Sequence, residues 1–418
     1  MRWFLTSTNF SLFIKHLRQP QWLVLTSRIQ MSPCTLRARG VARKLPRSIF
    51  ARRESASKFS PELRGRVTLT CISKCFSQYV TTKAIKRMET YRVRGSIAKA
   101  ARKLLFPLSF GPSSASLLYI LDQHLQGQYD RMNRAAYELV VVHIDLHLDA
   151  TDRKQSSELL DQYKSRFPRH TYCSFGLEDA LLLDNINWKA LNMPEPLQNH
   201  PSRPGMGRLE QLIRSMPSAT SRTDVITTLL TRLLVDVATR NGCESILFAD
   251  STTRLAEKTL TETAKGRGFS LPWQVSDGLT PYGIGFNYPL RDLLKKEVVT
   301  FSSLTIPPLT NLVILQGPSS HISASSKLTT IDDLMTQYFE SVEENYPSIV
   351  ANVVRTSSKL QPLTGDEATA CGLCGLPVAE GTDGIYGWGG DQNSASRVGE
   401  IVGNHKVLCY GCSRSING

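Results

Sequence analysis

104-LLFPLSFGPSSASLLYILDQHL-125 joins an apolar run typical of a buried strand to a periodic segment typical of a helix, through the turn SFGPSS. Phosphate-binding loops occupy such Gly- and Ser-rich turns, because free backbone N–H groups and the helix dipole converge on an anion there. Phe110 and Pro112, however, stand where such a loop leaves its backbone bare. The stretch therefore predicts the strand-turn-helix unit of a nucleotide-binding fold and leaves its chemistry open.

Strand-like and helix-like segments continue to alternate along the chain. Further strands are expected at 137–146, near 170–176 and at 244–251, and helices at 156–167, 221–242, 253–268, 289–301 and 331–360. Strands this apolar, separated by helices, are typical of parallel strands that are covered on both faces. The pattern predicts an α/β fold with a doubly wound, mostly parallel sheet.

The segment 221–242 has the clearest helical periodicity. Ser221 and Asp224 have the spacing of a capping box at its start, and Gly242 ends it. One apolar stripe runs along the segment through Val225, Leu229, Leu233 and Val237. The preceding segment, 185–220, is rich in Pro, Asn, Ser and Arg, and we expect a long surface loop there.

The positive charge of the chain is unevenly distributed. The 418 residues suffice for two or three folded units and carry a formal net charge of +14. Residues 1–53 hold 11 Lys and Arg and no acid, so the remainder carries 50 − 11 = 39 basic residues against 36 acidic ones. This Arg- and Ser-rich segment has either the composition of a mitochondrial transit peptide or that of an atypical N-terminus outside any domain. The sequence has no run of 18 apolar residues, so no membrane span is expected.

Two CxxC pairs are the strongest chemical signal. They are 371-CGLC-374 and 409-CYGC-412, so the four thiols belong to Cys371, Cys374, Cys409 and Cys412. Each short turn directs two sulfurs at one ion, which predicts a closed, tetrahedral, structural zinc site in a reducing compartment. His405 lies nearby in sequence, but with four thiolates available we expect it at the surface.

The other cysteines carry weaker signals. Cys71 and Cys75 have CxxxC spacing, and their one upstream partner is Cys34. They indicate either a second zinc ribbon or an incomplete one. Cys173 and Cys243 are isolated, with no sequence neighbour that would lower a thiol pKa, and we expect them to be core thiols.

A basic, aromatic-bearing segment follows the first Cys pair, and a helix is expected over 83–103. Phe76, Tyr79 and Tyr91 are interleaved with its charges, and Glu89 is the single acid. Such a segment suits a phosphate backbone and unstacked bases, although a charge run is also typical of a solvated helix face. The candidate tRNA-binding residues are Lys83, Lys86, Arg87, Arg92 and Arg94, with Lys99, Arg102 and Lys103 further along.

The turn SFGPSS resembles the SGGxDS loop of the PP-loop ATP pyrophosphatases, which adenylate a substrate carbonyl. Ser109, Gly111 and Ser114 match the motif, while Phe110 replaces a Gly and Ser113 replaces the Asp. The replaced Gly lets the family's backbone approach phosphate, and a Phe obstructs it. The resemblance therefore implies a degenerate nucleotide loop in which ATP binding is in doubt.

The second motif of the thiouridine-forming branch, GHNADDxAE, falls on 249-ADSTTRLAE-257. Ala256 and Glu257 are kept. The replaced positions are Ala249 and Asp250, for the Gly and His, and Thr253 and Arg254, for the two Asp. The family's paired catalytic cysteines have no counterpart either. Together these losses argue against an active adenylating enzyme.

Seen as an ordered set, the segments of residues 71–418 are similar to the fungal cytoplasmic tRNA 2-thiolation protein 2 family. The matching segments are CFSQYVTTKAIKRMETYRVRG, LLFPLSFGPSSASLLYILDQHL, VVHIDL, ILFADSTTRLAEKTL, PLRDLLKKEV, and CGLCG with CYGC. The resemblance implies a cytoplasmic accessory subunit of a tRNA-uridine 2-sulfurtransferase, without a catalytic residue of its own. It implies a heterodimer with the catalytic PP-loop subunit, tRNA as a ligand, and sulfur from a ubiquitin-related modifier. The tRNAs implied are those for lysine, glutamate and glutamine, modified at the wobble uridine, position 34.

Four parts are expected along the chain. They are an atypical basic segment at 1–66, a Cys-pair and basic helical element at 67–103, a degenerate PP-loop α/β domain at 104–360, and a zinc ribbon at 361–418. Two other functions remain open from the residues themselves. One is a divergent but active ATP pyrophosphatase acting on tRNA, and the other is a zinc-ribbon RNA-binding protein unrelated to thiolation.

Overall fold

The sheet is described by a computed structural model. It describes residues 61–91, 101–147, 150–191, 204–314, 329–362, 369–378 and 408–417. The chain divides into two units, Met1–Arg64 and Gly65–Gly418. Apart from the first residues of helix α2 (Pro61–Arg87), the features below lie in the second unit. No helix in the described ranges is both long enough and apolar enough to span a membrane.

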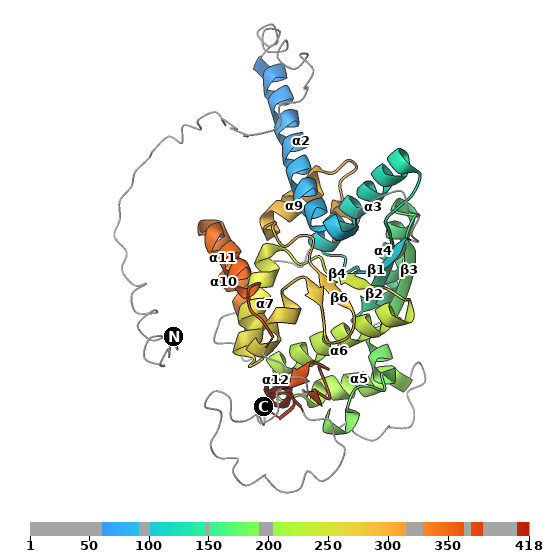
Figure 1. The fold of residues 1–418 in the computed structure, drawn as a ribbon, viewed down its shortest axis with the longest axis vertical. Coiled ribbons are helices and arrows are strands. Elements are labelled where there is room, and N and C mark those ends of the chain that lie inside the picture. The colour runs from blue at the N-terminus through green and yellow to red at the C-terminus, as the bar shows by residue number, and fades with distance from the viewer. Residues whose placement is uncertain are drawn as a thin grey trace, which may run out of the picture. The chain divides into compact units, whose positions relative to one another are not determined.

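Six strands form one sheet in the order β3-β2-β1-β4-β6-β5 (Figure 1). The strands are β1 (Arg102–Pro107), β2 (Tyr137–Asp145), β3 (Thr171–Gly176), β4 (Ser245–Leu247), β5 (Gly278–Leu279) and β6 (Gly285–Asn287). All neighbours are parallel except β5, which pairs antiparallel with β6. This confirms the predicted doubly wound, mostly parallel α/β fold of the PP-loop ATP pyrophosphatase type, although β5 and β6 had no strand signal in the sequence.

Helices cover both faces of the sheet (Figure 1). Leu104 and Phe106 of β1 face a core shared with α2, α3 (Pro112–Met132), α4 (Ala150–Arg166) and α9 (Lys295–Leu304). Leu105, between them in the chain, faces the opposite core. That second core is built with α5 (Pro204–Ser215), α6 (Ala219–Arg240), α7 (Thr252–Ala264), α10 (Ile331–Asn345), α11 (Pro347–Ser357) and α12 (Tyr410–Asn417). Successive side chains of this strand point to opposite faces of the sheet and therefore contribute to two apolar layers.

Two expectations about the middle of the chain are wrong. The surface loop expected at 185–220 contains α5, which forms because Leu209 and Leu212 lie three residues apart and are buried in the core. The capping box expected at Ser221 and Asp224 does not form. Helix α6 begins earlier, at Ala219, where the Ser218 hydroxyl accepts a hydrogen bond from the Ser221 N–H at 3.0 Å. The four residues of the predicted apolar stripe are all buried, as expected.

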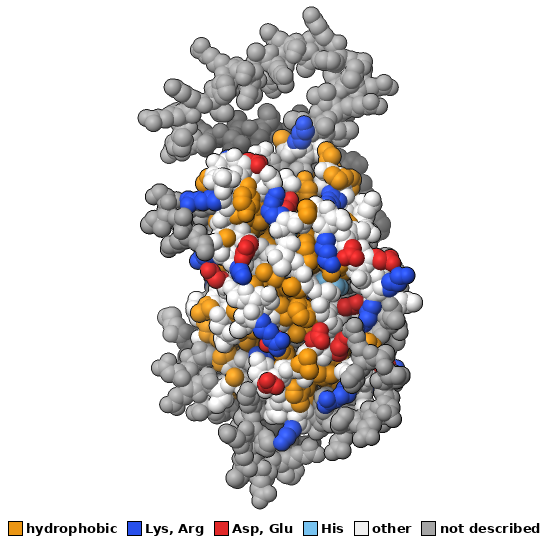
Figure 2. All heavy atoms as spheres, turned by 90° about the vertical axis from the view of Figure 1, so that its right-hand side faces the viewer, with side chains coloured by type: hydrophobic (Ala, Val, Ile, Leu, Met, Phe, Trp, Pro, Cys, Tyr) orange, Lys and Arg blue, Asp and Glu red, His pale blue; other side chains and the backbone are white. Residues whose placement is uncertain are grey.

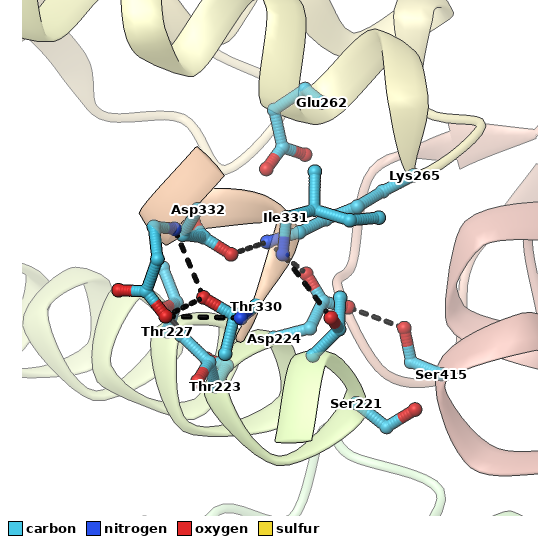
Figure 3. Close-up of polar contacts among 12 residues, drawn as sticks. Ser221, Thr223, Asp224, Thr227, Glu262, Lys265, Thr330, Ile331, Asp332 and Ser415 are labelled. Carbon is cyan, nitrogen blue, oxygen red and sulfur yellow. Dashed lines mark hydrogen bonds and ion pairs between the residues drawn. The ribbon is translucent and has the colours of Figure 1, made fainter. Parts of the chain in front are cut away.

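Asp224 is instead the centre of a buried charge network (Figure 3). Arg267 donates to both of its carboxylate oxygens, and Lys265 Nζ lies 3.2 Å from Asp224 Oδ1 and 2.7 Å from Asp332 Oδ2. The Ser415 hydroxyl donates to Asp224 Oδ2 at 2.6 Å. The network therefore joins α6, the end of α7, α10 and α12 through one carboxylate.

Burial by itself would raise the pKa of Asp224, but the neighbouring charges of Arg267 and Lys265 outweigh it, so the pKa lies below its usual value. A carboxyl whose pKa is lowered by folding stabilises the native state above its unfolded pKa. This stabilisation is lost as the pH falls through the folded pKa.

We predict that Asp224→Asn lowers the free energy of unfolding by about 3–5 kcal/mol, because it leaves two buried cations without their shared counter-charge. Urea unfolding at pH 7 measures the loss. The exposed Asp184 provides the control, since Asp184→Asn should change stability by less than about 0.5 kcal/mol. The difference between the wild type and Asp224→Asn should shrink as the pH falls below about 4. A difference that stays constant down to pH 3 would contradict this account of Asp224.

Candidate functional site

The SFGPSS turn lies at the switch point of the sheet. It follows β1, whose neighbours are β2 on one side and β4 on the other, and it leads into α3. Open α/β sheets bind ligands at this point, outside the carboxyl ends of the strands. The hydroxyl groups of the turn bond to each other instead. Ser109 Oγ donates to Ser114 Oγ at 3.2 Å, and Ser114 Oγ donates to the Gly111 carbonyl at 3.0 Å.

Phe110 adopts a backbone conformation that favours glycine. Its φ is +58°, in the left-handed region, and its ring is 2% exposed. The ring stacks on His143 at 4.2 Å and on Tyr163 at 5.5 Å between centroids. Its carbonyl accepts a hydrogen bond from the Ile314 N–H at 2.8 Å. The turn therefore has a glycine-like backbone conformation at Phe110, and the buried aromatic ring anchors it to the core.

The partner of that ring, His143, is held neutral by its surroundings. Its Nδ1 lies 2.9 Å from the Leu108 carbonyl, which identifies Nδ1 as the donor. Burial lowers the pKa of His143, more than this hydrogen bond raises it. A neutral imidazole stacked on Phe110 contributes packing and offers no positive charge to a phosphate.

The second degenerate motif holds helix α10. Thr253 donates its hydroxyl to Glu343 Oε2 at 2.5 Å and accepts a hydrogen bond from the Lys295 N–H at 3.0 Å. The other oxygen of Glu343 accepts from the Lys296 N–H at 2.9 Å, at the start of α9. An Asp at position 253 would place a second buried carboxylate against Glu343. The hydroxyl of Thr253 therefore allows α7, α9 and α10 to share the one carboxylate of Glu343.

Arg254 and Glu257 form a pair beside this contact. Arg254 Nη1 lies 3.0 Å from Glu257 Oε2, and the half-exposed guanidinium covers a carboxylate that is 4% exposed. Burial raises the pKa of Glu257, although the charge of Arg254 opposes the shift. Thr336 of α10 donates to the same oxygen at 3.4 Å. Asp250, the remaining acid of the motif, is half-buried in the short loop between β4 and α7.

The four C-terminal cysteines come together. All four are buried, and their Sγ atoms lie within 4.8 Å of one another. Cys371 and Cys374 lie on the turn between β7 (Thr369–Ala370) and β8 (Pro377–Val378), while Cys409 and Cys412 lie at and just inside the start of α12. Four thiol donors at these distances match a closed tetrahedral zinc site, with no position left open for catalysis. Within the described residues, this is the one cluster of three or more metal-binding side chains.

Neighbouring residues shape the turn between the first two cysteines. Gly375 has a φ of +75°, and its N–H donates to the Cys371 carbonyl at 2.9 Å. A Cβ at Gly375 would lie 2.1 Å from Arg232, so the position requires glycine for space as well as for conformation. Tyr282 donates its hydroxyl to the Cys374 carbonyl at 2.6 Å, which fixes the turn to the rest of the body.

The candidate tRNA-binding residues differ in the contacts that they make within the protein. Arg87 donates to both carboxylate oxygens of Asp292, at 2.6 and 2.9 Å, and Lys83 donates to the Asp292 carbonyl at 3.0 Å. Lys86 is exposed on the same helix. Arg92 and Arg94 lie outside the described residues, as does Lys99.

The basic helix expected over 83–103 is shorter than predicted. Helix α2 ends at Arg87, and Arg102 and Lys103 belong to β1. There they pair with Glu244 and Glu138, at 2.9 and 3.8 Å. The run LLFP that follows these two residues pairs with β2 and β4. Because the pairing with β2 begins at Arg102, both cations belong to the strand.

Among the residues that the structure describes, the other cysteines form no metal-binding cluster. Cys71 and Cys75 both lie in α2, where Cys75 is exposed, and the side chain of Cys71 is outside the described part. Cys243 is buried, which raises its pKa to about 11, and Cys173 is half-buried. Cys34 and His405 lie outside the described residues.

Three residues that the sequence did not single out matter at these sites. Asp292 binds Arg87, Glu343 binds Thr253, and Arg232 lies against Gly375. Asp292 stands in PLRDLLKKEV, a segment that the family resemblance did include. No local pattern marks any of the three, because each acts on a residue far away in the chain.

These features define the class of the protein: a PP-loop-type α/β body with a buried Phe in its switch-point turn and a cluster of four cysteines. The chain belongs to the cytoplasmic tRNA 2-thiolation protein 2 family. It is 50% identical over 347 residues to the member from Phaeosphaeria nodorum, covering 82% of this chain and 88% of that protein. It is 63% identical over 280 residues to the member from Sclerotinia sclerotiorum, covering 67% and 75%. The family model of that name matches residues 330–394.

Among solved structures, the chain is similar to the U34-tRNA thiolase NcsA from Methanococcus maripaludis with its 4Fe-4S cluster. That similarity has a TM-score of 0.46 at 16% identity, covering 74% of this chain and 85% of the thiolase. The NAD+ synthetase from Burkholderia pseudomallei matches with a TM-score of 0.32 at 12% identity, covering 68% and 87%.

We predict that Phe110→Ala lowers the free energy of unfolding by about 3–5 kcal/mol, because the buried ring leaves a cavity against His143 and Tyr163. Phe110→Gly should lower the free energy of unfolding by less than the cavity alone would, since glycine adopts a positive φ without strain. Urea unfolding of both variants provides the test. Equal stability of Phe110→Ala and the wild type would show that the ring does not anchor the loop.

We also predict that replacing Cys371 and Cys374 with Ser lowers the metal content by about one ion per chain. Elemental analysis of the purified protein measures the loss, and Cys173→Ser is the control on a half-buried thiol outside the cluster. The same metal content in the double variant and the wild type would exclude the cluster as the metal site.

Proposed function

We propose that this chain is the noncatalytic subunit of the complex that 2-thiolates the wobble uridine, position 34, of cytoplasmic Lys, Glu and Gln tRNAs. It pairs with the catalytic PP-loop thiolation subunit, binds tRNA and stabilises that partner. The sulfur comes from a ubiquitin-related modifier. The name of the family supports the reaction and the cytoplasmic location.

The observation that carries the noncatalytic role is the Phe110 ring at the switch point. An adenylating loop needs backbone N–H groups that are free to meet the phosphates of ATP. Here the ring is buried, and the Phe110 carbonyl accepts from Ile314. The turn therefore carries an apolar anchor where a phosphate loop carries bare backbone.

The second motif supports the same role. An active PP-loop ATP pyrophosphatase places acids after the fourth strand to hold magnesium, because this ion prefers carboxylate oxygens. Thr253 instead bonds to Glu343, and Arg254 supplies a positive charge beside Glu257. Thr253 helps to hold α10, Arg254 pairs within α7, and neither side chain is a magnesium ligand.

The cysteine cluster has a structural part in this proposal. Four buried thiolates would hold zinc without an open coordination position, so the ion would join the CGLC turn to α12. Removing it should loosen this join and leave the chemistry of the partner's site unchanged.

We predict that the chain alone neither hydrolyses ATP nor exchanges pyrophosphate, and that Ser113→Ala leaves thiolation by the assembled complex nearly unchanged. The corresponding Asp of the catalytic partner should be essential, so its removal should abolish thiolation. Co-purification of both variants with their partner subunits separates lost assembly from lost chemistry. If Ser113→Ala assembles normally but thiolation falls a hundredfold, the loop would lower the barrier by about 2.7 kcal/mol and the noncatalytic role would be wrong.

A further inference from the structure

The cations near the N-terminal end of the described body differ in how they are used. Arg87 is held by Asp292 through two hydrogen bonds, and Lys83 donates to the carbonyl of that same residue. Arg102 pairs with Glu244 and Lys103 with Glu138. These four cations are already engaged with this chain, so a nucleic acid would have to displace an existing contact to bind any of them.

Arg87 is tied most firmly. The charge of Asp292 raises the pKa of the Arg87 guanidinium, and Arg87 in turn contributes to lowering the pKa of Asp292 against the effect of burial. Tyr79 of the same helix donates to Glu297 at 3.3 Å. These contacts fasten α2 to the segment between β6 and α9, so Arg87 and Lys83 are anchors of the helix.

Lys86 is different. Its ammonium is exposed and makes no hydrogen bond or ion pair with a residue in the described ranges. Lys86 lines a hollow of about 560 Å³ between α2 and α3. Arg131, near the end of α3, lines the same hollow.

The remaining lining suits an anionic ligand that is partly apolar. Thr81, Thr82 and Gln123 offer hydroxyl and amide groups, and Ile85 offers an apolar surface. Glu89 and His124 also line the hollow, and the carboxylate of Glu89 offsets part of the positive charge of Lys86 and Arg131. Phosphate oxygens accept from cations and hydroxyls, while the sugar of a nucleotide packs on apolar side chains.

Gly127 leaves space for the guanidinium of Arg131, the second cation of the hollow. Arg131 Nε donates to the Gly127 carbonyl at 2.7 Å, and Nη2 lies 3.0 Å from where a Cβ of Gly127 would be. A side chain at Gly127 would crowd the guanidinium. The remaining N–H groups of Arg131 have no acceptor among the described residues, and the group is exposed.

One face of the molecule carries charges of both signs. On the face shown in Figure 2, Lys and Arg side chains alternate with Asp and Glu around apolar side chains, without a continuous basic area. Where charges are mixed, a few unpaired cations in a hollow decide where a phosphate backbone can be held.

We propose that the hollow between α2 and α3 is a binding site for the sugar-phosphate backbone of RNA, with Lys86 and Arg131 as the phosphate-binding cations. The inference rests on the proposed function for the identity of the RNA, a tRNA. It assigns Lys83 and Arg87 to positioning of α2, and it adds Arg131, which lies outside the basic segment recognised in the sequence.

The test is tRNA binding by the full-length chain, measured as a dissociation constant across a range of salt concentrations. The probe is a tRNA transcript with uridine at position 34. We expect the double variant Lys86→Ala, Arg131→Ala to weaken binding about tenfold at moderate salt. The slope of log K against log salt should become smaller by about two, one for each lost phosphate contact.

Two matched variants make the result specific. Lys189 and Lys359 are exposed, belong to other parts of the body and make no described ion pair, so Lys189→Ala, Lys359→Ala removes the same charge elsewhere. It should leave affinity and slope unchanged. The conservative pair Lys86→Arg, Arg131→Lys keeps both charges and should keep the slope. Thermal unfolding should be the same for all variants, because each altered side chain is exposed.

The outcomes separate the site from the function. If the wild type binds tRNA with salt dependence and the Lys86, Arg131 variant does so equally well, the hollow is not the site, although tRNA binding stands. If the control pair weakens binding as much, total charge decides binding and the site assignment is overturned. If the wild type shows no salt-dependent tRNA binding, the tRNA-binding part of the proposed function fails, and the site fails with it.

Discussion

One buried carboxylate, Asp224, connects much of the body. It meets Arg267 and Lys265 at the end of α7 and Ser415 of α12, while Lys265 also reaches Asp332 at the start of α10. Buried ion pairs have a large desolvation cost, and removing one partner leaves an uncompensated charge. Helix α12, which carries two cysteines of the C-terminal cluster at its start, and helix α10 are therefore both positioned relative to this one carboxylate.

The two degenerate motifs have a common physical explanation. Where an enzyme of this fold class needs bare backbone and paired acids, this chain has a buried ring at Phe110 and a hydroxyl at Thr253. Both replacements add contacts within the protein. A group that binds substrate must keep its hydrogen-bonding capacity free of partners within the protein. Each contact within the protein therefore increases stability and reduces ligand binding. The site has thus become part of the core and of the attachment of α10.

The cations of α2 have two different roles. Arg87 and Lys83 are engaged with Asp292, which holds the helix in place. Lys86, one residue before Arg87, is exposed at a hollow. A helix turns by about 100° per residue, so adjacent cations face different surroundings. One helix can therefore be anchored by some of its charges and present others to a ligand.

Local sequence determined the architecture of this protein and the four cysteines of its candidate metal site. The apolar runs and helical periods predict the first four parallel strands and most of the helices, because these depend on residues that are near each other in the chain. The spacing of the two CxxC pairs likewise identifies four ligands from short turns. The SFGPSS turn indicates a lost phosphate loop, because a Phe stands in place of the glycine of the related motif.

Only the tertiary structure decided what the charged and polar residues do. Arg87 meets Asp292 across 205 positions of the chain, and Thr253 meets Glu343 across 90. Asp224 looked like part of a helix cap and is instead the centre of a buried network with Arg267, 43 positions away. Two-residue strands such as β5 also form only because a neighbouring strand offers hydrogen bonds. Such contacts leave no local pattern, since the chain brings the partners together only when the whole sheet is wound.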